Sequence, residues 1–168
     1  MIRQNFNAGW TVEKGDGNSR MNSFLGNTQT KTVHLPYDAM IHEARTPDTK
    51  NGAQTGFYPG GEYIFQKHFP APQAWQGKPV SLVFEGVYQT ALVYLNGWLL
   101  TRNVNGYAEF TVEAGPYLKY GADNLLKVIA DNSLEPNSRW YTGSGIYRPV
   151  RLLVGNKVYL PQDTVRIT

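Results

Sequence analysis

Apolar and polar side chains alternate with a period of two residues along much of the chain. Within residues 62–69, Tyr63, Phe65 and Phe69 fall on one face of an extended segment, and Ile64, Gln66 and His68 fall on the other. Such runs of four to eight residues, rich in aromatic and β-branched side chains and bounded by Gly, Asn or Pro, predict β-strands.

Three further segments follow the same logic. Residues 80–84 place Val80, Leu82 and Phe84 on one face. Residues 125–130 are apolar apart from Lys127, which predicts a strand covered on both sides. Residues 151–154 form another short apolar run, and residues 157–160 are strand-like as well.

A hairpin is the sharpest local prediction. The apolar runs 92–95 and 98–100 flank the pair Asn96-Gly97. Both residue types adopt a positive φ at low cost, as a type I′ turn requires.

Two long polar connections separate these strands, at residues 40–58 and 132–145. We find no window of twelve residues with apolar positions at helical spacing. Eight or more short strands without helices predict an all-β fold, a jelly-roll β-sandwich, formed by residues 1–168 as a single domain. Long loops in such compact domains are often functional.

Composition narrows the function classes. The chain has 168 residues, 41% of them hydrophobic and 17% charged, and this balance excludes a disordered chain. The net charge is +3 and the basic residues are scattered, so we expect no nucleic-acid partner. No apolar run approaches the ~20 residues of a membrane span, and the amino terminus lacks the apolar core of a signal peptide. We therefore expect no membrane partner, and the compartment stays unknown.

Catalytic and metal-binding motifs are missing from the sequence. It has no Cys, no G-x-S-x-G, no phosphate-binding loop and no H-E-x-x-H, and its three His residues are dispersed. Glu62 and Glu85 lie within strand patterns, where we expect solvated carboxylates rather than a glycosidase pair. We predict neither a cofactor nor a metal site.

The segment 131–148 is the most informative part of the chain. It combines acids, amides, two Arg and three aromatic rings in a glycine-bearing loop before a strand. Planar hydrogen-bonding groups beside aromatic faces suit a polyhydroxylated ligand. The alternative is a structural turn in which Arg139 and Arg148 pair with nearby acids. Trp75, Trp98 and Trp140 lie near turns, where exposure is expected.

Nine short pieces of the sequence resemble glycoside hydrolase family two, in the expected order. They are Asn5-Phe6-Asn7-x-Gly9-Trp10, Leu35-Pro36-Tyr37-Asp38, Tyr58-x-Gly60-Gly61-x-Tyr63, Phe84-x-Gly86-Val87-Tyr88, Ala91, Val93-Tyr94-Leu95-Asn96-Gly97, Gly106-Tyr107-x-x-Phe110, Asp131-Asn132-Ser133 and the run from Arg139 to Arg148. The resemblance covers nearly the whole chain.

The resemblance implies a galactose-binding-domain-like sandwich placed before an immunoglobulin-like domain and a catalytic barrel. It implies a β-galactosidase-like parent enzyme that hydrolyses terminal β-glycosidic bonds. Both catalytic Glu residues would come from the barrel, so we expect no catalytic residue in this chain and no activity from it alone. The expected partners are a carbohydrate at its non-reducing end and the other domains of the same enzyme. A homo-oligomeric parent is left open.

Substrate-binding candidates carried over by motif are Asn137, Ser138, Arg139 and Trp140, together with Tyr58 at the end of the first long loop. Several family members place an acid in the loop before the Gly-Ile-aromatic-Arg end of the motif, and this sequence has Asn137, Ser138 and Arg139 there. Two other hypotheses remain: a free-standing carbohydrate-binding module, and a structural interaction domain without sugar contact.

Overall fold

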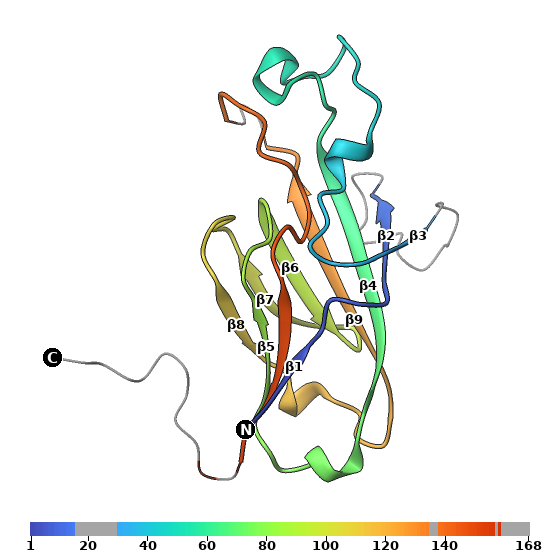
Figure 1. Ribbon diagram of the computed structural model, residues 1–168, viewed down its shortest axis with the longest axis vertical. Helices are drawn as coiled ribbons and strands as arrows, with labels where there is room; N and C mark the ends of the chain where they lie inside the picture. Colours follow the sequence, from blue (N-terminus) through green and yellow to red (C-terminus); the bar gives the residue numbers. More distant parts are fainter. Residues whose placement is uncertain (16–29, 135–137, 157, 159–168) are drawn as a thin grey trace, which may run out of the picture.

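The computed structural model describes residues 1–15, 30–134, 138–156 and 158, which form an all-β sandwich (Figure 1). Ten strands are present in this part of the chain: β1 (Ile2–Asn5), β2 (Trp10–Lys14), β3 (Lys31–Val33), β4 (Gly61–Ala71), β5 (Val80–Phe84), β6 (Thr90–Leu95), β7 (Trp98–Asn103), β8 (Phe110–Glu113), β9 (Ala122–Asn132) and β10 (Val150–Val154). The connections contain the 3-10 helices η1 (Met40–His42), η2 (Gly52–Thr55), η3 (Gln73–Trp75) and η4 (Gly115–Tyr117). The predicted all-β fold is confirmed.

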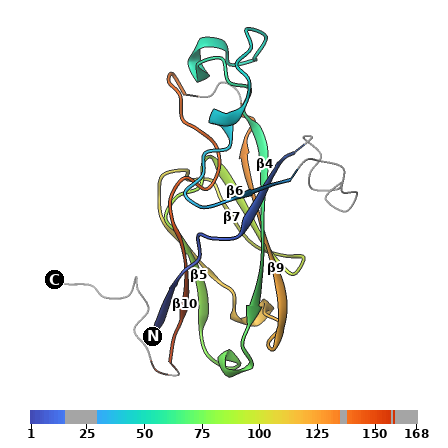
Figure 2. The same cartoon turned by 45° about the vertical axis from the view of Figure 1, so that its right-hand side comes forward.

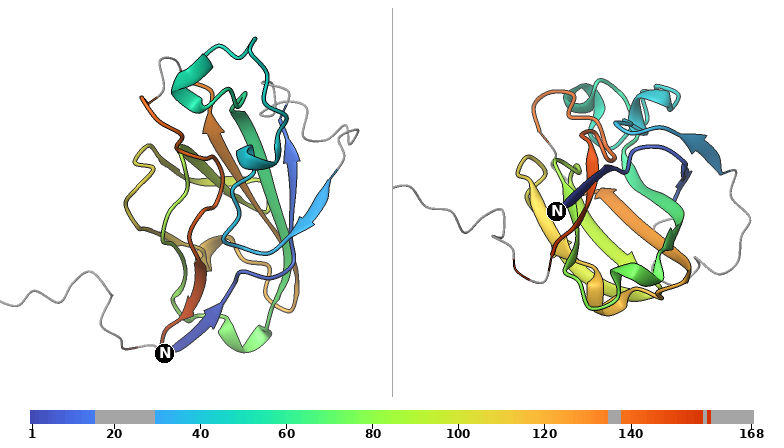
Figure 3. Two further views of the ribbon diagram at one scale, coloured as in Figure 1. Left: turned by 45° about the horizontal axis from the view of Figure 1, so that its top comes forward. Right: turned by 60° about the horizontal axis from the view of Figure 1, so that its bottom comes forward.

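Two antiparallel sheets pack face to face (Figure 3). The smaller sheet has the strand order β1-β10-β5-β8, and the larger has the order β3-β2-β4-β9-β6-β7. Strands β4 and β9, each of eleven residues, pair along their whole length in the middle of the larger sheet. The segments predicted at 62–69, 80–84, 125–130 and 151–154 lie within β4, β5, β9 and β10.

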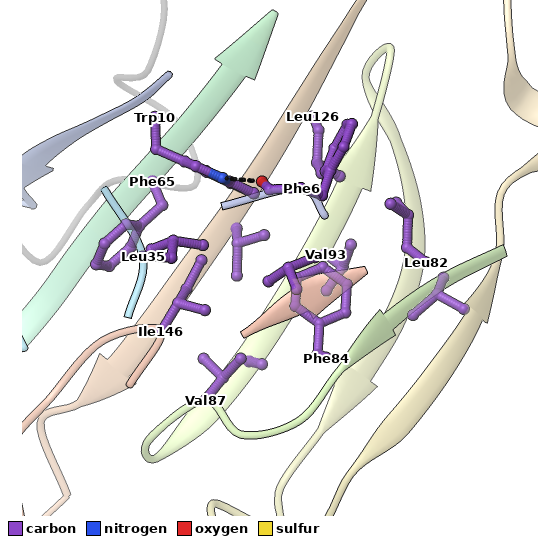
Figure 4. Packing of buried hydrophobic residues seen from close by; sticks show 14 of the residues in the cluster. Phe6, Trp10, Leu35, Phe65, Leu82, Phe84, Val87, Val93, Leu126 and Ile146 are labelled. Carbon is purple, nitrogen blue, oxygen red and sulfur yellow. Dashed lines mark hydrogen bonds between the residues drawn. The ribbon is translucent and has the colours of Figure 1, made fainter. Parts of the chain in front are cut away.

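The core lies between the sheets and follows the alternation seen in the sequence (Figure 4). Tyr63, Phe65 and Phe69 of β4 are buried there, as predicted. The opposite face of β4 is partly buried as well. Ile64 is also buried, because it packs with Leu92 and Ile129 in a small second cluster on the outside of the larger sheet.

A crossover joins the two sheets on one side of the sandwich (Figure 2). After β1, the chain passes from the smaller sheet to β2 of the larger sheet. The Trp10 indole Nε1 donates to the Phe6 carbonyl at 2.8 Å, and the Asn7 Oδ1 accepts from the Val150 amide at 2.8 Å. Gly9, at φ 70°, provides the turn between them. These contacts explain the residue types of the first sequence motif.

The predicted hairpin is confirmed as the β6–β7 connection. Asn96 and Gly97 have φ values of 53° and 90°. The Asn96 side chain also ties the turn to its neighbours, since Oδ1 accepts from the Leu125 amide at 3.1 Å and Nδ2 donates to the Tyr117 carbonyl at 2.8 Å and to Asn124 Oδ1 at 2.7 Å. The turn is therefore fixed by tertiary contacts as well as by its own geometry.

The expectation of solvated carboxylates at Glu62 and Glu85 was wrong. Glu62 is only 8% exposed on β4, and Glu85, directly after β5, forms an ion pair with Arg151 of β10. The sequence could not reveal this because both environments come from strands distant in the chain. The strand-like run 157–160 lies outside the described residues except for Val158, which is exposed.

The two long connections meet at one end of the sandwich. In Figure 1, residues 40–60 and the described residues of the connection between β9 and β10 lie together at the top, while β1 begins at the bottom. The register agrees, because Ile2 pairs with Val154 at the far end of the smaller sheet. We call the end formed by residues 34–60 and by the described residues 138–149 the rim.

Candidate functional site

Backbone hydrogen bonds join the two rim loops. The Tyr37 amide donates to the Ile146 carbonyl and the Ala39 amide donates to the Ser144 carbonyl, both at 2.8 Å. This pairing resembles two rungs of a sheet, although neither segment belongs to a strand. It brings residues more than a hundred positions apart in the sequence into a single surface.

Gly145 occupies the centre of this junction. It exchanges two backbone hydrogen bonds with Tyr88, at 2.9 and 3.0 Å, so a third segment joins the pair. Its φ is 136°, and a Cβ at this position would lie 2.7 Å from the Tyr37 carbonyl oxygen. Only glycine fits, since backbone atoms of the neighbouring loop occupy the space of a side chain.

Asp38 anchors the rim through its carboxylate. Oδ1 accepts from the backbone amides of Met40 at 3.1 Å and Ser144 at 2.9 Å, and Oδ2 accepts from the Tyr141 hydroxyl at 2.6 Å. A Cβ on Gly143 would lie 2.7 Å from Oδ2, so the chain passes directly against the carboxylate. Charge-assisted hydrogen bonds of this kind are roughly twice as strong as neutral ones.

Tyr141, held by Asp38, packs in turn against Tyr58. The two rings meet edge to face with centroids 5.2 Å apart. Burial, followed by the hydrogen bond to the Asp38 carboxylate, raises the pKa of Tyr141 above its ordinary value. The phenol consequently stays protonated near neutral pH and holds its ring in place as a donor. The Arg45 guanidinium also lies over the Tyr58 ring, 5.8 Å from its centroid.

The structure places four of the five predicted site residues at the rim. Ser138 makes a local turn, in which its hydroxyl donates to the Trp140 carbonyl at 2.8 Å and its Oγ lies 3.2 Å from the Trp140 amide nitrogen. Arg139 is exposed, Trp140 is 64% exposed, and Tyr58 is half-buried against Tyr141. Asn137 lies outside the described residues. Ser138 therefore shapes the loop, whereas Arg139 and Trp140 face solvent.

A second group of aromatic residues extends this end of the molecule. Tyr88 meets Tyr107 edge to face with centroids 5.4 Å apart, and the Tyr147 hydroxyl donates to the Gly106 carbonyl at 2.8 Å. Arg148 lies 5.3 Å from the centroid of the Tyr147 ring. The alternative of a structural turn, in which Arg148 pairs with an acid, has no such ion pair among the described residues; there the Arg148 Nη1 lies 3.5 Å from the Tyr107 carbonyl oxygen.

Sequence reasoning missed Asp38 and Tyr141 as site residues, although both lie in the quoted motifs. The bond from Met40 to Asp38 spans two residues, but the bonds from Tyr141 and Ser144 span 103 and 106. Apart from the motifs themselves, the local turn from Asp38 to the Met40 amide was the signal that the sequence offered.

Other candidate chemistry is sparse in the part of the chain that the structure describes. No group of three or more His, Asp or Glu residues there could hold a metal ion. His68 of β4 pairs with Asp123 of β9 at 2.6 Å, so it is a satisfied histidine within a sheet. No helix in these residues is long and apolar enough to cross a membrane.

A match to a protein-family model shows the family to which this chain belongs. The sequence model of the family described as glycosyl hydrolase 2 galactose-binding domain-like matches residues 10–153, which include both rim loops. The chain belongs to this family. The resemblance seen in the short motifs is thereby confirmed.

Named relatives of this galactose-binding-like domain are glycosidases. A β-galactosidase of Bacteroides ovatus is 37% identical over 150 residues, which are 89% of this chain and 18% of the relative. A β-glucuronidase of Formosa agariphila is 30% identical over 166 residues, covering 88% of this chain and 16% of the relative. The chain thus spans less than a fifth of the length of these two relatives.

Solved structures agree in fold. A glycosyl hydrolase family 2 member from Bacteroides cellulosilyticus superposes with a TM-score of 0.84 at 31% identity, covering 93% of this chain and 21% of that one. A β-glycosidase from Bacteroides vulgatus gives a TM-score of 0.79 at 37% identity, covering 92% of this chain and 20% of that one. The galactose-binding-like sandwich is therefore shared with much longer enzymes.

Proposed function

We propose that this chain is the amino-terminal domain of a β-galactosidase-like glycoside hydrolase that cleaves terminal β-glycosidic bonds. Its role there is to buttress the catalytic barrel and to form part of the wall of the pocket around the terminal sugar. The reactive carboxylates belong to the barrel, so the domain contributes binding and shape rather than a chemical step. Relatives about five times as long favour this role over a free-standing carbohydrate-binding module.

The observation that carries the proposal is the rim anchored by Asp38. A carboxylate with three donors fixes Tyr141, Tyr141 packs on Tyr58, and the neighbouring Arg139 and Trp140 face solvent. An exposed indole offers a flat surface for the C–H face of a sugar, and a guanidinium donates to hydroxyl oxygens. Groups held in place before binding lose little entropy when the ligand arrives.

Binding at the rim affects catalysis through the orientation of the bound sugar. A sugar held in one pose presents its glycosidic bond to the carboxylates of the barrel, and good positioning lowers the barrier of the chemical step. A polar donor at the pocket wall also discriminates between sugars, because an unmatched buried polar group costs about 1–3 kcal/mol.

The proposal is tested in the full-length enzyme with the variant Trp140→Ala. We expect kcat/KM for an aryl β-galactoside to fall about tenfold, equivalent to about 1.4 kcal/mol of lost transition-state binding. Trp98→Ala is the matched control, because Trp98 is equally exposed on the β6–β7 hairpin. Equal kinetics for the two variants and the parent would contradict a role of the rim in binding.

A second measurement addresses the isolated chain. We expect no turnover of aryl β-galactosides or β-glucuronides by residues 1–168 alone. Reproducible turnover that disappears on replacing an acid of this chain would place the chemistry here and refute the proposal.

A further inference from the structure

A hollow of about 280 Å³ opens in the first rim loop, beside Tyr58. The described residues that line it are Arg45, Thr46, Pro47 and Phe57, none of which belongs to the predicted site. Arg45 also lies over the Tyr58 ring, so the hollow is continuous with the rim. The hollow is shallow and largely open to solvent, so it offers a surface for one sugar ring or its substituent rather than an enclosed pocket.

Arg45 is positioned but only partly used. Its Nε donates to the Gly56 carbonyl at 2.8 Å, which orients the guanidinium plane. It forms no ion pair with any acid among the described residues, whereas the nearby Glu43 pairs with Lys14 at 2.7 Å. The terminal nitrogens of Arg45 therefore remain available as a fork of donors, the geometry that matches a carboxylate or sulfate.

Phe57 is held in an unfavourable backbone conformation next to this guanidinium. Its φ is 66°, a left-handed value that costs a bulky residue free energy. Two backbone hydrogen bonds hold it, from its own amide to the Gly52 carbonyl at 2.9 Å and from the Thr46 amide to its carbonyl at 3.0 Å. The ring stays 37% exposed instead of joining the core. Such an arrangement provides an apolar surface beside a cation.

We propose that this hollow is a subsite for an anionic group, a carboxylate or a sulfate, carried by a saccharide bound at the rim. The Arg45 fork pairs with the anion, and the Phe57 ring packs against the sugar ring that carries it. Arg139 adds a second cation to the rim, also without an ion pair among the described residues. The inference rests on the proposed function, because the saccharide is the ligand of the rim.

The test is a titration of the ¹⁵N-labelled 168-residue chain, whose two sheets bury one continuous core of their own. The probes are galactose, sodium galacturonate, galactose 6-sulfate and inorganic sulfate. The readouts are the Arg45 Nε–Hε and Phe57 amide resonances for the hollow, and the Trp140 indole resonance for the rim. We expect at least one anionic sugar to shift the resonances of the hollow, with an affinity that falls as salt screens the charge. The responses to galacturonate and to galactose 6-sulfate distinguish the two anions.

The variant Arg45→Gln should weaken binding of the anionic sugar about five- to tenfold, while Arg3→Gln on β1, an exposed arginine at the opposite end of the sandwich, should leave it unchanged. Three results would overturn the subsite: shifts of the hollow by galactose as large as those by the charged sugars, equal binding of inorganic sulfate alone, or no shift in any titration. If no anion affects Arg45, the subsite fails, and this result by itself leaves the proposed function untouched. Loss of the proposed function would instead appear in the kinetics of the full-length Trp140→Ala enzyme.

Discussion

Trp98 and Trp140 are almost equally exposed, at 66% and 64%, but their surroundings differ. Trp98 follows the β6–β7 turn and has Tyr117 as its aromatic neighbour, with ring centroids 6.5 Å apart. Trp140 follows a serine turn and is flanked in sequence by the cationic Arg139 and by Tyr141, which packs on Tyr58. Exposure alone therefore does not mark a binding residue. What distinguishes the two rings is the cation and the second aromatic residue next to Trp140.

The polar side chains that hold the two segments, Asn96 at the hairpin and Asp38 at the rim, also differ. At the hairpin, the Asn96 amide group satisfies backbone and side-chain partners of its own end of the sandwich. At the rim, the Asp38 carboxylate binds two backbone amides and uses its third contact to hold Tyr141, whose ring contributes to the surface. Asn96 therefore stabilises a turn, whereas Asp38 also holds the Tyr141 side chain at the surface.

Removing the Asp38 carboxylate should give the largest loss of stability, because it removes the group that anchors the rim. Asp38→Ala leaves the Met40 and Ser144 amides and the Tyr141 hydroxyl without their acceptor, so we expect a loss of about 3 kcal/mol of unfolding free energy. For a chain of this size, the melting temperature should fall by about 6–12 °C. Asp48→Ala, an exposed acid of the same loop, serves as the control. A melting temperature equal to that of the parent chain would show that the carboxylate does not anchor the rim.

Replacing Asn96 should destabilise the opposite end without affecting the rim. Asn96→Ala removes three hydrogen bonds and places alanine at φ 53°, for an expected loss of about 2 kcal/mol. Asn96→Gly should recover about 1 kcal/mol of this loss, because glycine tolerates the left-handed conformation. Chemical denaturation gives both values. The kcat/KM of the full-length enzyme for an aryl β-galactoside should be unchanged in either variant, and a changed value would mean that the two ends are coupled.

The sequence predicted the hairpin and the long strands because their determinants are local. Asn96-Gly97 needs only its own conformational preference, and the alternation within β4 needs only one buried face. The short strands β1, β3 and β8 escaped prediction, since three or four residues carry too little periodicity and their pairing partners are far away in the chain. The same distinction between local and long-range determinants applies to the site residues. Trp140 and Arg139 stood out by residue type, whereas the role of Asp38 depends on donors from the other rim loop.

The smallest effect is expected from Tyr141→Phe, which distinguishes the contribution of the Tyr141 hydroxyl from that of its ring. Tyr141→Phe keeps the packing on Tyr58 but loses the bond to Asp38, so we expect a loss of about 1 kcal/mol near neutral pH. Because the pKa of Tyr141 is raised in the folded protein, its contribution is fully present below the unfolded value of about 10 and is lost as pH rises beyond it. Burial also raises the pKa of Tyr63, Tyr88 and Tyr120, so these three phenols likewise favour the folded state less as the pH rises in alkali. The difference in unfolding free energy between the parent chain and Tyr141→Phe should therefore shrink between about pH 9 and 11. A difference that stays constant over this range would mean that the hydroxyl does not donate to Asp38, and the carboxylate would then hold the rim only through the Met40 and Ser144 amides.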